Sequence, residues 1–153
     1  MKSIRGITVA AAAAMIAAGV LMTPATAHAV MPLNGTFNVA TDRSSGTWVI
    51  TSTCSSADSC VAQVKTPMWT ATAQVAGNDM WHMAVDIPDG ITCTEGTGMA
   101  QVAKTGPSHQ EYFWNQFTDN ATETSGSFDN TWPPCGDNPG GSTHKSFTMT
   151  KVG

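Results

Sequence analysis

Histidine, serine and acidic residues are the groups in this chain that could support nucleophilic or acid–base catalysis. Beyond residue 29 the histidines are His82, His109 and His144. A hydrolase triad needs a nucleophile, a base and an orienting acid, and no G-x-S-x-G motif marks a nucleophile here. We therefore assign no catalytic residue and favour a protein without enzymatic activity. A carboxylate within hydrogen-bond reach of one of these histidines in a cleft would favour a hydrolase instead.

The string Met80-Trp81-His82-Met83 is the strongest hint of a metal site. Strand-like alternation places Met80 and His82 on one face, where a thioether and an imidazole would suit Cu(I). The sequence offers no second ligand cluster, so we expect no metal and no cofactor. Met80 and His82 remain candidates for weak ligand contact. Trp132, which precedes Pro133 and Pro134 in an expected loop, is the third such candidate.

The four cysteines could form either a metal site or disulfides. A four-thiolate zinc site usually shows close C-x-x-C pairs, whereas the spacings here are 5, 32 and 41 intervening residues. We predict two structural disulfides and, of the three possible pairings, favour Cys54–Cys60 and Cys93–Cys135. The longer loop of the second pair restricts the unfolded chain more, so that bond should contribute more, ~3–4 kcal/mol.

Tryptophan could either fill the core or line a ligand site. Trp48, Trp69 and Trp81 occupy inward positions of alternating segments, which predicts core positions for them. An enclosed cavity above about 300 Å³ lined by Trp and Met would favour a small ligand, whereas a filled interior would favour surface recognition.

The elements that must position these side chains read as β-strands. Beyond residue 30 the chain shows period-2 alternation and no sustained helical period. Turn-forming residues gather at 42–46, 76–79, 88–90 and 133–141, and 119–145 is the least regular part. This spacing predicts an all-β antiparallel sandwich or closed barrel of about eight or nine short strands. The expected strands are 35–40, 47–52, 60–64, 69–75, 80–87, 99–103, 110–114, 122–128 and 146–152.

Residues 1–29 have the three parts of a secretory signal peptide. Lys2 and Arg5 form a positive start, an Ala-rich apolar segment follows at 7–22, and Ala27-His28-Ala29 matches a small-x-small cleavage site. The apolar segment is shorter than the ~20 residues that a membrane span needs. We expect cleavage after Ala29, a single secreted β domain over residues 30–153, and no membrane anchor.

The charge balance bears on the partners that the protein could bind. The whole chain has 7 basic and 11 acidic residues, a net charge of −4. Loss of Lys2 and Arg5 with the signal would bring the net charge to −6. An acidic chain of this kind is a poor match for phosphate backbones, so we do not expect nucleic-acid binding.

The order of Trp, Cys and Gly landmarks over about residues 33–153 carries a resemblance. It runs from Thr47-Trp-Val-Ile-Thr-Ser-Thr-Cys54 through Cys60-Val-Ala-Gln-Val64 and Ile91-Thr-Cys93 to Pro134-Cys-Gly136. This order resembles the small secreted proteins of mycobacteria and related actinobacteria. It is also similar to the β-rich extracellular C-terminal segments of some of their Ser/Thr kinases. The resemblance implies export and architecture rather than an activity.

The sequence therefore favours a secreted, monomeric, non-enzymatic binding or interaction module of the cell envelope or extracellular space. Its partner would be an unidentified small ligand, an envelope component or a protein. An envelope hydrolase with an unrecognised site is one alternative, and a structural or antigenic secreted protein is another.

Overall fold

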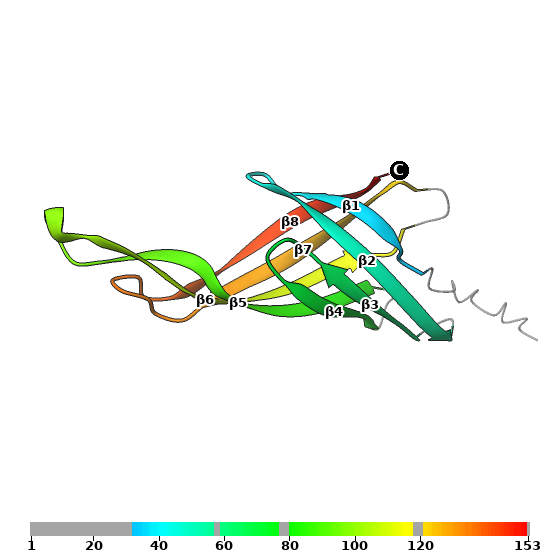
Figure 1. The fold of residues 1–153 in the computed structure, drawn as a ribbon, viewed down its shortest axis with the longest axis horizontal. Helices are drawn as coiled ribbons and strands as arrows, with labels where there is room; N and C mark the ends of the chain where they lie inside the picture. Colours follow the sequence, from blue (N-terminus) through cyan, green and yellow to red (C-terminus); the bar gives the residue numbers. More distant parts are fainter. Residues whose placement is uncertain (1–31, 57–58, 77–79, 118–120, 153) are drawn as a thin grey trace, which may run out of the picture.

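The computed structural model describes residues 32–56, 59–76, 80–117 and 121–152, and it is all-β. Eight antiparallel strands follow one another around a closed barrel, in which the last strand pairs with the first (Figure 1). The predicted signal peptide and its cleavage site lie outside the described residues. The strands are β1 (Gly35–Ala40), β2 (Ser45–Ser56), β3 (Ser59–Lys65), β4 (Thr70–Ala76), β5 (Met80–Glu95), β6 (Val102–Asn115), β7 (Glu123–Trp132) and β8 (Gly141–Val152), with a 3₁₀ turn η1 (Gly98–Ala100) between β5 and β6.

The barrel interior is built from the alternating residues of each strand. In β3, Cys60, Ala62 and Val64 are buried while their neighbours along the strand are exposed. Ala62 pairs across the ladder with Ala73 of β4, and both are fully buried. Small side chains on this wall leave room for large ones opposite, because an eight-stranded barrel is only wide enough for one layer of side chains.

Two tryptophans fill much of that interior. Trp81 of β5 and Trp114 of β6 form a cross-strand pair, and their rings stack with centroids 6.1 Å apart and planes 8° apart. Both are almost completely buried, together with Phe37, Ile50 and Met83. The predicted core positions of Trp48 and Trp81 are confirmed, whereas Trp69 is only half-buried because it lies at one end of the barrel.

The strands differ in length, and this shapes the molecule. The hairpin formed by β5 and β6 reaches far beyond the barrel, and the end of the β7–β8 hairpin extends in the same direction (Figure 1). Sequence patterns predicted a turn at 88–90 and separate strands at 99–103 and 110–114. The structure instead continues β5 through Pro88–Gly90 as a bulge, and β6 is a single strand. The extra residues of β5 are accommodated by a register shift between Ile87 and Ile91 opposite Ser108 and Gly106.

The segment expected to be irregular is largely a strand pair. β7 and β8 pair continuously from Glu123 and Thr150 to Trp132 and Gly141. Trp132 was expected in an exposed loop, but it is the last residue of β7 and is half-buried. Its indole nitrogen donates to Asn138 Oδ1 at 3.4 Å, which holds the ring against the connection that follows.

Both predicted disulfide pairings are confirmed. Cys54–Cys60 closes the β2–β3 hairpin, and Cys93–Cys135 ties the long β5–β6 hairpin to the β7–β8 connection. The second bond is supported by hydrogen bonds from Asp137 N to Thr94 O and from Gly96 N to Asp137 Oδ2, at 2.8 and 2.9 Å.

Within the described residues, no helix is long and apolar enough to span a bilayer.

Candidate functional site

Two threonine-based turns form the rim at one end of the barrel. Thr41 Oγ1 accepts hydrogen bonds from the backbone of Arg43 and Ser44 in the β1–β2 turn, at 3.2 and 3.1 Å. In the β3–β4 turn, Thr66 Oγ1 accepts from Met68 N and Trp69 N at 3.1 and 3.0 Å. A threonine oxygen that accepts hydrogen bonds from the N–H groups of its own turn stabilises the conformation of that turn, with no contact from another element needed.

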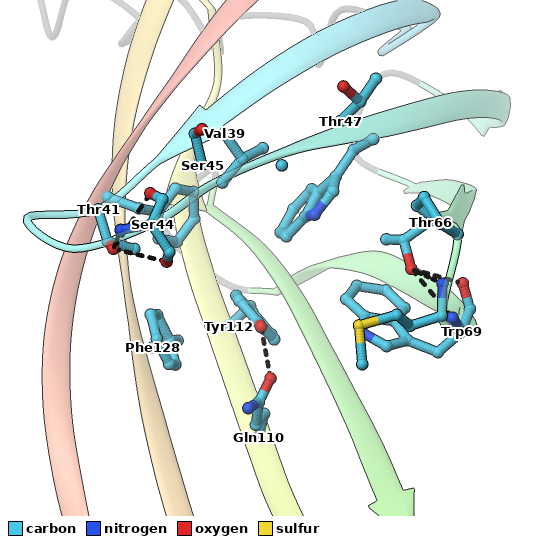
Figure 2. A pocket seen from close by; sticks show the side chains of 15 residues that line it. Val39, Thr41, Ser44, Ser45, Thr47, Thr66, Trp69, Gln110, Tyr112 and Phe128 are labelled. Carbon is cyan, nitrogen blue, oxygen red and sulfur yellow. Dashed lines mark hydrogen bonds between the residues drawn. The ribbon is translucent and has the colours of Figure 1, made fainter. Parts of the chain in front are cut away.

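Between these turns lies a pocket of about 430 Å³, which we call the mouth pocket (Figure 2). Its floor is aromatic, because Trp48 contacts Trp69, Tyr112 and Phe147 with ring centroids 5.8, 5.3 and 5.8 Å apart. Met68 lies on its rim and is 79% exposed, so the pocket opens to solvent there. The mouth pocket is lined by Val39, Thr41, Ser44, Ser45, Gly46, Thr47, Trp48, Thr66, Pro67, Met68, Trp69, Gln110, Tyr112, Phe128 and Phe147.

One polar pair lies among the aromatic rings. The Tyr112 hydroxyl donates to Gln110 Oε1 at 2.5 Å, and Figure 2 shows this bond between two lining side chains of β6. Burial raises the pKa of Tyr112 to about 12, because a phenolate would lose its hydration there. Among the described residues, the Gln110 amide nitrogen has no hydrogen-bond acceptor, so it can donate to a bound molecule.

No lining residue of the mouth pocket carries a charge. Aromatic and aliphatic surface favours apolar parts of a ligand, and the rim hydroxyls and Gln110 provide a few hydrogen-bonding groups. An ion placed there would lose hydration without gaining a partner of opposite charge. The pocket is therefore suited to an uncharged molecule.

Gly46 gives the mouth pocket part of its volume. It pairs across the ladder with Val39, whose buried side chain lines the same pocket, and it lies two residues before the inward-facing Trp48. A Cβ built on Gly46 meets no atom within 4 Å. A larger residue at this position would occupy the pocket without displacing the protein around it.

A second cleft, of about 660 Å³, contains the arrangement that would favour a hydrolase. His109 Nδ1 lies 2.7 Å from Asp86 Oδ1, and Glu111 Oε1 lies 3.5 Å from His109 Nε2. The carboxylates raise the pKa of His109, mainly because its ring N–H donates a hydrogen bond to Asp86. Ser108 also lines this cleft, but its side chain lies on the opposite face of β6 from that of His109.

These groups do not assemble into a catalytic triad. Within the described part of the chain, no hydroxyl is hydrogen bonded to the His109 ring, and its Nε2 is directed towards Glu111 instead. His144 forms a similar exposed pair with Asp129 at 2.8 Å. Among the described residues, His109 and Asp86 would supply a base and its orienting acid, but no nucleophilic hydroxyl is bonded to the ring, as acyl transfer would require.

The three residues expected to make weak ligand contacts are placed apart. His82 stacks on Phe113 with centroids 4.7 Å apart, and Met80 pairs with Asn115 at the other end of the barrel. Neither lines the mouth pocket or the second cleft, whereas Trp132 lines the second cleft. Among the described residues, no group of three or more His, Cys, Asp or Glu side chains is arranged to hold a metal ion.

Of the residues that define the mouth pocket, the sequence singled out Trp48 and Trp69, but as core positions, and it did not single out Gly46, Gln110 or Tyr112. Gly46 could have been found, because it shares the inward alternation of Trp48 and Ile50. Alternation places Gln110 and Tyr112 on one face of their strand. It does not reveal that β1–β4 end short of this part of β6, so that both side chains line the pocket. The pocket depends on that difference in strand length.

Comparisons with known proteins found no match, so a proposal of function must rest on the geometry of the structure. No protein-family model matches the chain. No curated protein and no solved structure matches it either.

Proposed function

We propose that this protein is an exported, non-enzymatic binding protein whose barrel mouth holds a small, uncharged and largely apolar molecule. The observation that carries the proposal is the mouth pocket itself, about 430 Å³ of space with Trp48, Trp69 and Tyr112 at its floor. A volume in this range accommodates ligands of small-molecule size. The filled interior below Trp114 limits the ligand to this end of the barrel.

The lining also indicates the kind of molecule that would bind. An aromatic or cyclic portion would pack against Trp48 and Trp69, since ring pairs gain stability beyond area burial alone. A carbonyl or ether oxygen would accept a hydrogen bond from the Gln110 amide. Hydroxyl groups of Thr41, Ser44 and other rim residues would contact the polar end of the ligand.

Export is part of the proposal and has three supports. The two disulfides are compatible with an oxidising environment such as the extracellular space. The signal-like residues 1–29 and the resemblance to secreted actinobacterial proteins point the same way. The hydrolase alternative is supported by the His109–Asp86 pair, although no hydroxyl of the described residues is hydrogen bonded to that ring.

Native mass spectrometry of protein purified from its own culture medium would test this function. We expect a reproducible adduct of small-molecule mass that is released when the protein unfolds. Gly46→Leu should abolish the adduct, because the new side chain would occupy the open space of the pocket. Thr51→Leu makes a similar addition at an exposed position of the same strand, and it should leave the adduct unchanged.

Two results would contradict the proposal. One is a bare mass for the wild-type protein under conditions that preserve its fold. The other is an adduct that Gly46→Leu retains at the wild-type level, since the molecule would then bind elsewhere.

A further inference from the structure

Within the described residues, strand β8 lacks a neighbour on one side over part of its length. Strand β1 pairs with β8 only as far as Ala40 and Thr148, whereas β7 pairs with it down to Gly141. The segment 141–146, which we call the free edge, therefore has a neighbouring strand on one side only, and Figure 1 shows β8 continuing past the end of β1. The residues of the free edge are exposed, except that Lys145 is half-buried.

The direction of the backbone groups on the free edge follows from the ladders. Lys151 N donates to Thr122 O, on the β7 side of β8, at 2.7 Å. Backbone groups alternate sides along an antiparallel strand, and the β7–β8 register is continuous. The N–H and C=O groups of Ser142, His144 and Ser146 therefore point away from β7, towards the open side of the sheet.

The other edge of the same region, on β5, is interrupted, whereas the free edge of β8 is regular. Strand β4 pairs with β5 only as far as Met83, so the rest of β5 is also an edge. Pro88 and the bulge between Ile87 and Ile91 interrupt that edge. Proline and bulges protect edge strands from pairing with other chains. The free edge of β8 contains neither, so it can accept another extended strand.

Lys145 indicates what such a strand would carry. It lies on the inner face of β8, two residues from the buried Phe147 and opposite Phe128 of β7. Among the described residues, its ammonium group forms no ion pair. A strand added beside β8 would place one side chain directly opposite Lys145, in the more closely spaced type of pair that has no hydrogen bonds of its own. A carboxylate is the side-chain group that this position favours.

A second copy of this chain does not provide that carboxylate. Residues 141–147 read Gly-Ser-Thr-His-Lys-Ser-Phe and contain no acidic side chain. Two free edges paired with each other would bring both Lys145 side chains onto one shared inner face, with no carboxylate from either edge to offset the charge. The charge therefore disfavours self-association and favours a different polypeptide.

We propose that the free edge of β8 binds an extended segment of another polypeptide, which adds an antiparallel strand and places an acidic side chain opposite Lys145. Main-chain hydrogen bonds to Ser142, His144 and Ser146 provide the affinity, and the pair with Lys145 provides the selectivity. None of the residues 142–146 lines the mouth pocket or the second cleft, so this site does not depend on the function proposed above.

Hydrogen exchange measured by NMR can test this site, because the geometry fixes which amides a bound strand covers. The probe is the peptide acetyl-Thr-Val-Glu-Val-Thr-Val-amide. It should shift the amide signals of Ser142, His144 and Ser146 and slow their exchange with solvent. The amides of Thr143 and Lys145 point to β7, so their exchange should be slow before the peptide is added.

Two methylated peptides separate strand pairing from general binding. Methylation of the three valine nitrogens removes the N–H groups that donate to the free edge, so binding should weaken by about tenfold or more. Methylation of the glutamate and threonine nitrogens instead alters the edge of the peptide that faces away from β8. That peptide should bind within about threefold of the unmodified one.

The charge requirement is tested with a peptide that has glutamine in place of glutamate. It should bind the wild-type protein about fivefold more weakly, because the cross-strand charge pair is lost. Lys145→Gln should bind the glutamate and glutamine peptides equally. Lys65→Gln removes the same charge at an exposed position of β3 and should preserve the difference between the two peptides.

Three outcomes would overturn the inference. The first is a titration that leaves the amides of Ser142, His144 and Ser146 unchanged. The second is equal binding of the two methylated peptides, or equal binding of the glutamate and glutamine peptides to the wild-type protein. The third is protection of the same amides at higher protein concentration without any peptide, which would assign the free edge to a second copy of the chain.

Discussion

Tyr112 is the single tyrosine of the chain, and its hydroxyl donates to Gln110, which also lines the mouth pocket. Its side chain is 8% exposed, so ionisation would place a negative charge among aromatic rings. This environment, rather than a charged neighbour, is what raises its pKa. The residue therefore reports directly on whether the floor of the pocket is closed to water.

An ultraviolet titration of this one phenol should show a midpoint at about 12 in the folded protein, against 10.0 for an exposed tyrosine. Between these two values the unfolded chain binds fewer protons than the folded one, so stability falls as pH rises. Two pKa units correspond to a loss of roughly 2–3 kcal/mol by pH 12. Urea unfolding at pH 9 and pH 11.5 would measure that loss. A midpoint near 10 would show that the floor is open to solvent.

At the scale of strands, Gly126 in β7 is a position where the interior leaves no room for a side chain. A Cβ at this position would lie 2.5 Å from Phe113 O and 2.7 Å from Trp114 Cβ, and it would also overlap the Phe147 ring. Strand β7 therefore needs a glycine where the rings of its neighbours fill the interior. Gly46 in β2 is the opposite case, because its inward side is empty.

The same substitution at these two glycines should therefore have different effects. Gly126→Ala should lower the free energy of unfolding by about 1–3 kcal/mol through overpacking. Gly46→Ala should change it by less than about 0.5 kcal/mol, or raise it slightly, because the unfolded chain becomes less flexible. Urea midpoints of the two variants and wild type would measure this. Equal midpoints for the two variants would mean that the strands pack differently.

The two disulfides act on different parts of the fold. Cys54–Cys60 links residues separated by 6 positions, whereas Cys93–Cys135 links residues separated by 42. The double variant Cys93→Ser with Cys135→Ser should lose about 4 kcal/mol of stability on the loop-entropy estimate. Cys54→Ser with Cys60→Ser should lose about 2 kcal/mol on the same estimate. Chemical denaturation of both variants would compare them, and a larger loss for the shorter loop would show that burial of Cys60 outweighs loop length.

At the scale of the whole molecule, alternation predicted the fold class well. The inward positions of Trp48 and Trp81 followed from local alternation, and the favoured pairing of the cysteines, one of three possible, followed from the short loop between Cys54 and Cys60. The alternation did not distinguish a sandwich from a barrel, because the pairing of β8 with β1 joins residues far apart in the sequence. It also placed a turn at Pro88–Gly90, where the structure has a bulge.

Neither cleft could be derived from the sequence. The mouth pocket exists because β1–β4 turn back at Thr41–Ser44 and Thr66–Trp69 while β5–β8 continue. The second cleft exists because Pro107 and Pro133 come opposite one another at the end of a ladder. Both features depend on register between strands, and no local pattern encodes that register.

An NMR titration with a neutral probe, followed through the indole N–H signals of the five tryptophans, tests the central claim most directly. N-benzylacetamide combines an uncharged aromatic ring with a carbonyl that can accept from Gln110. It should shift the indole signals of Trp48 and Trp69 and leave that of Trp132 unchanged. Gly46→Leu should abolish these shifts, and Thr51→Leu should preserve them. Shifts of Trp48 and Trp69 that persist in Gly46→Leu, or their absence in the wild-type protein, would contradict the assignment of the barrel mouth as a ligand site.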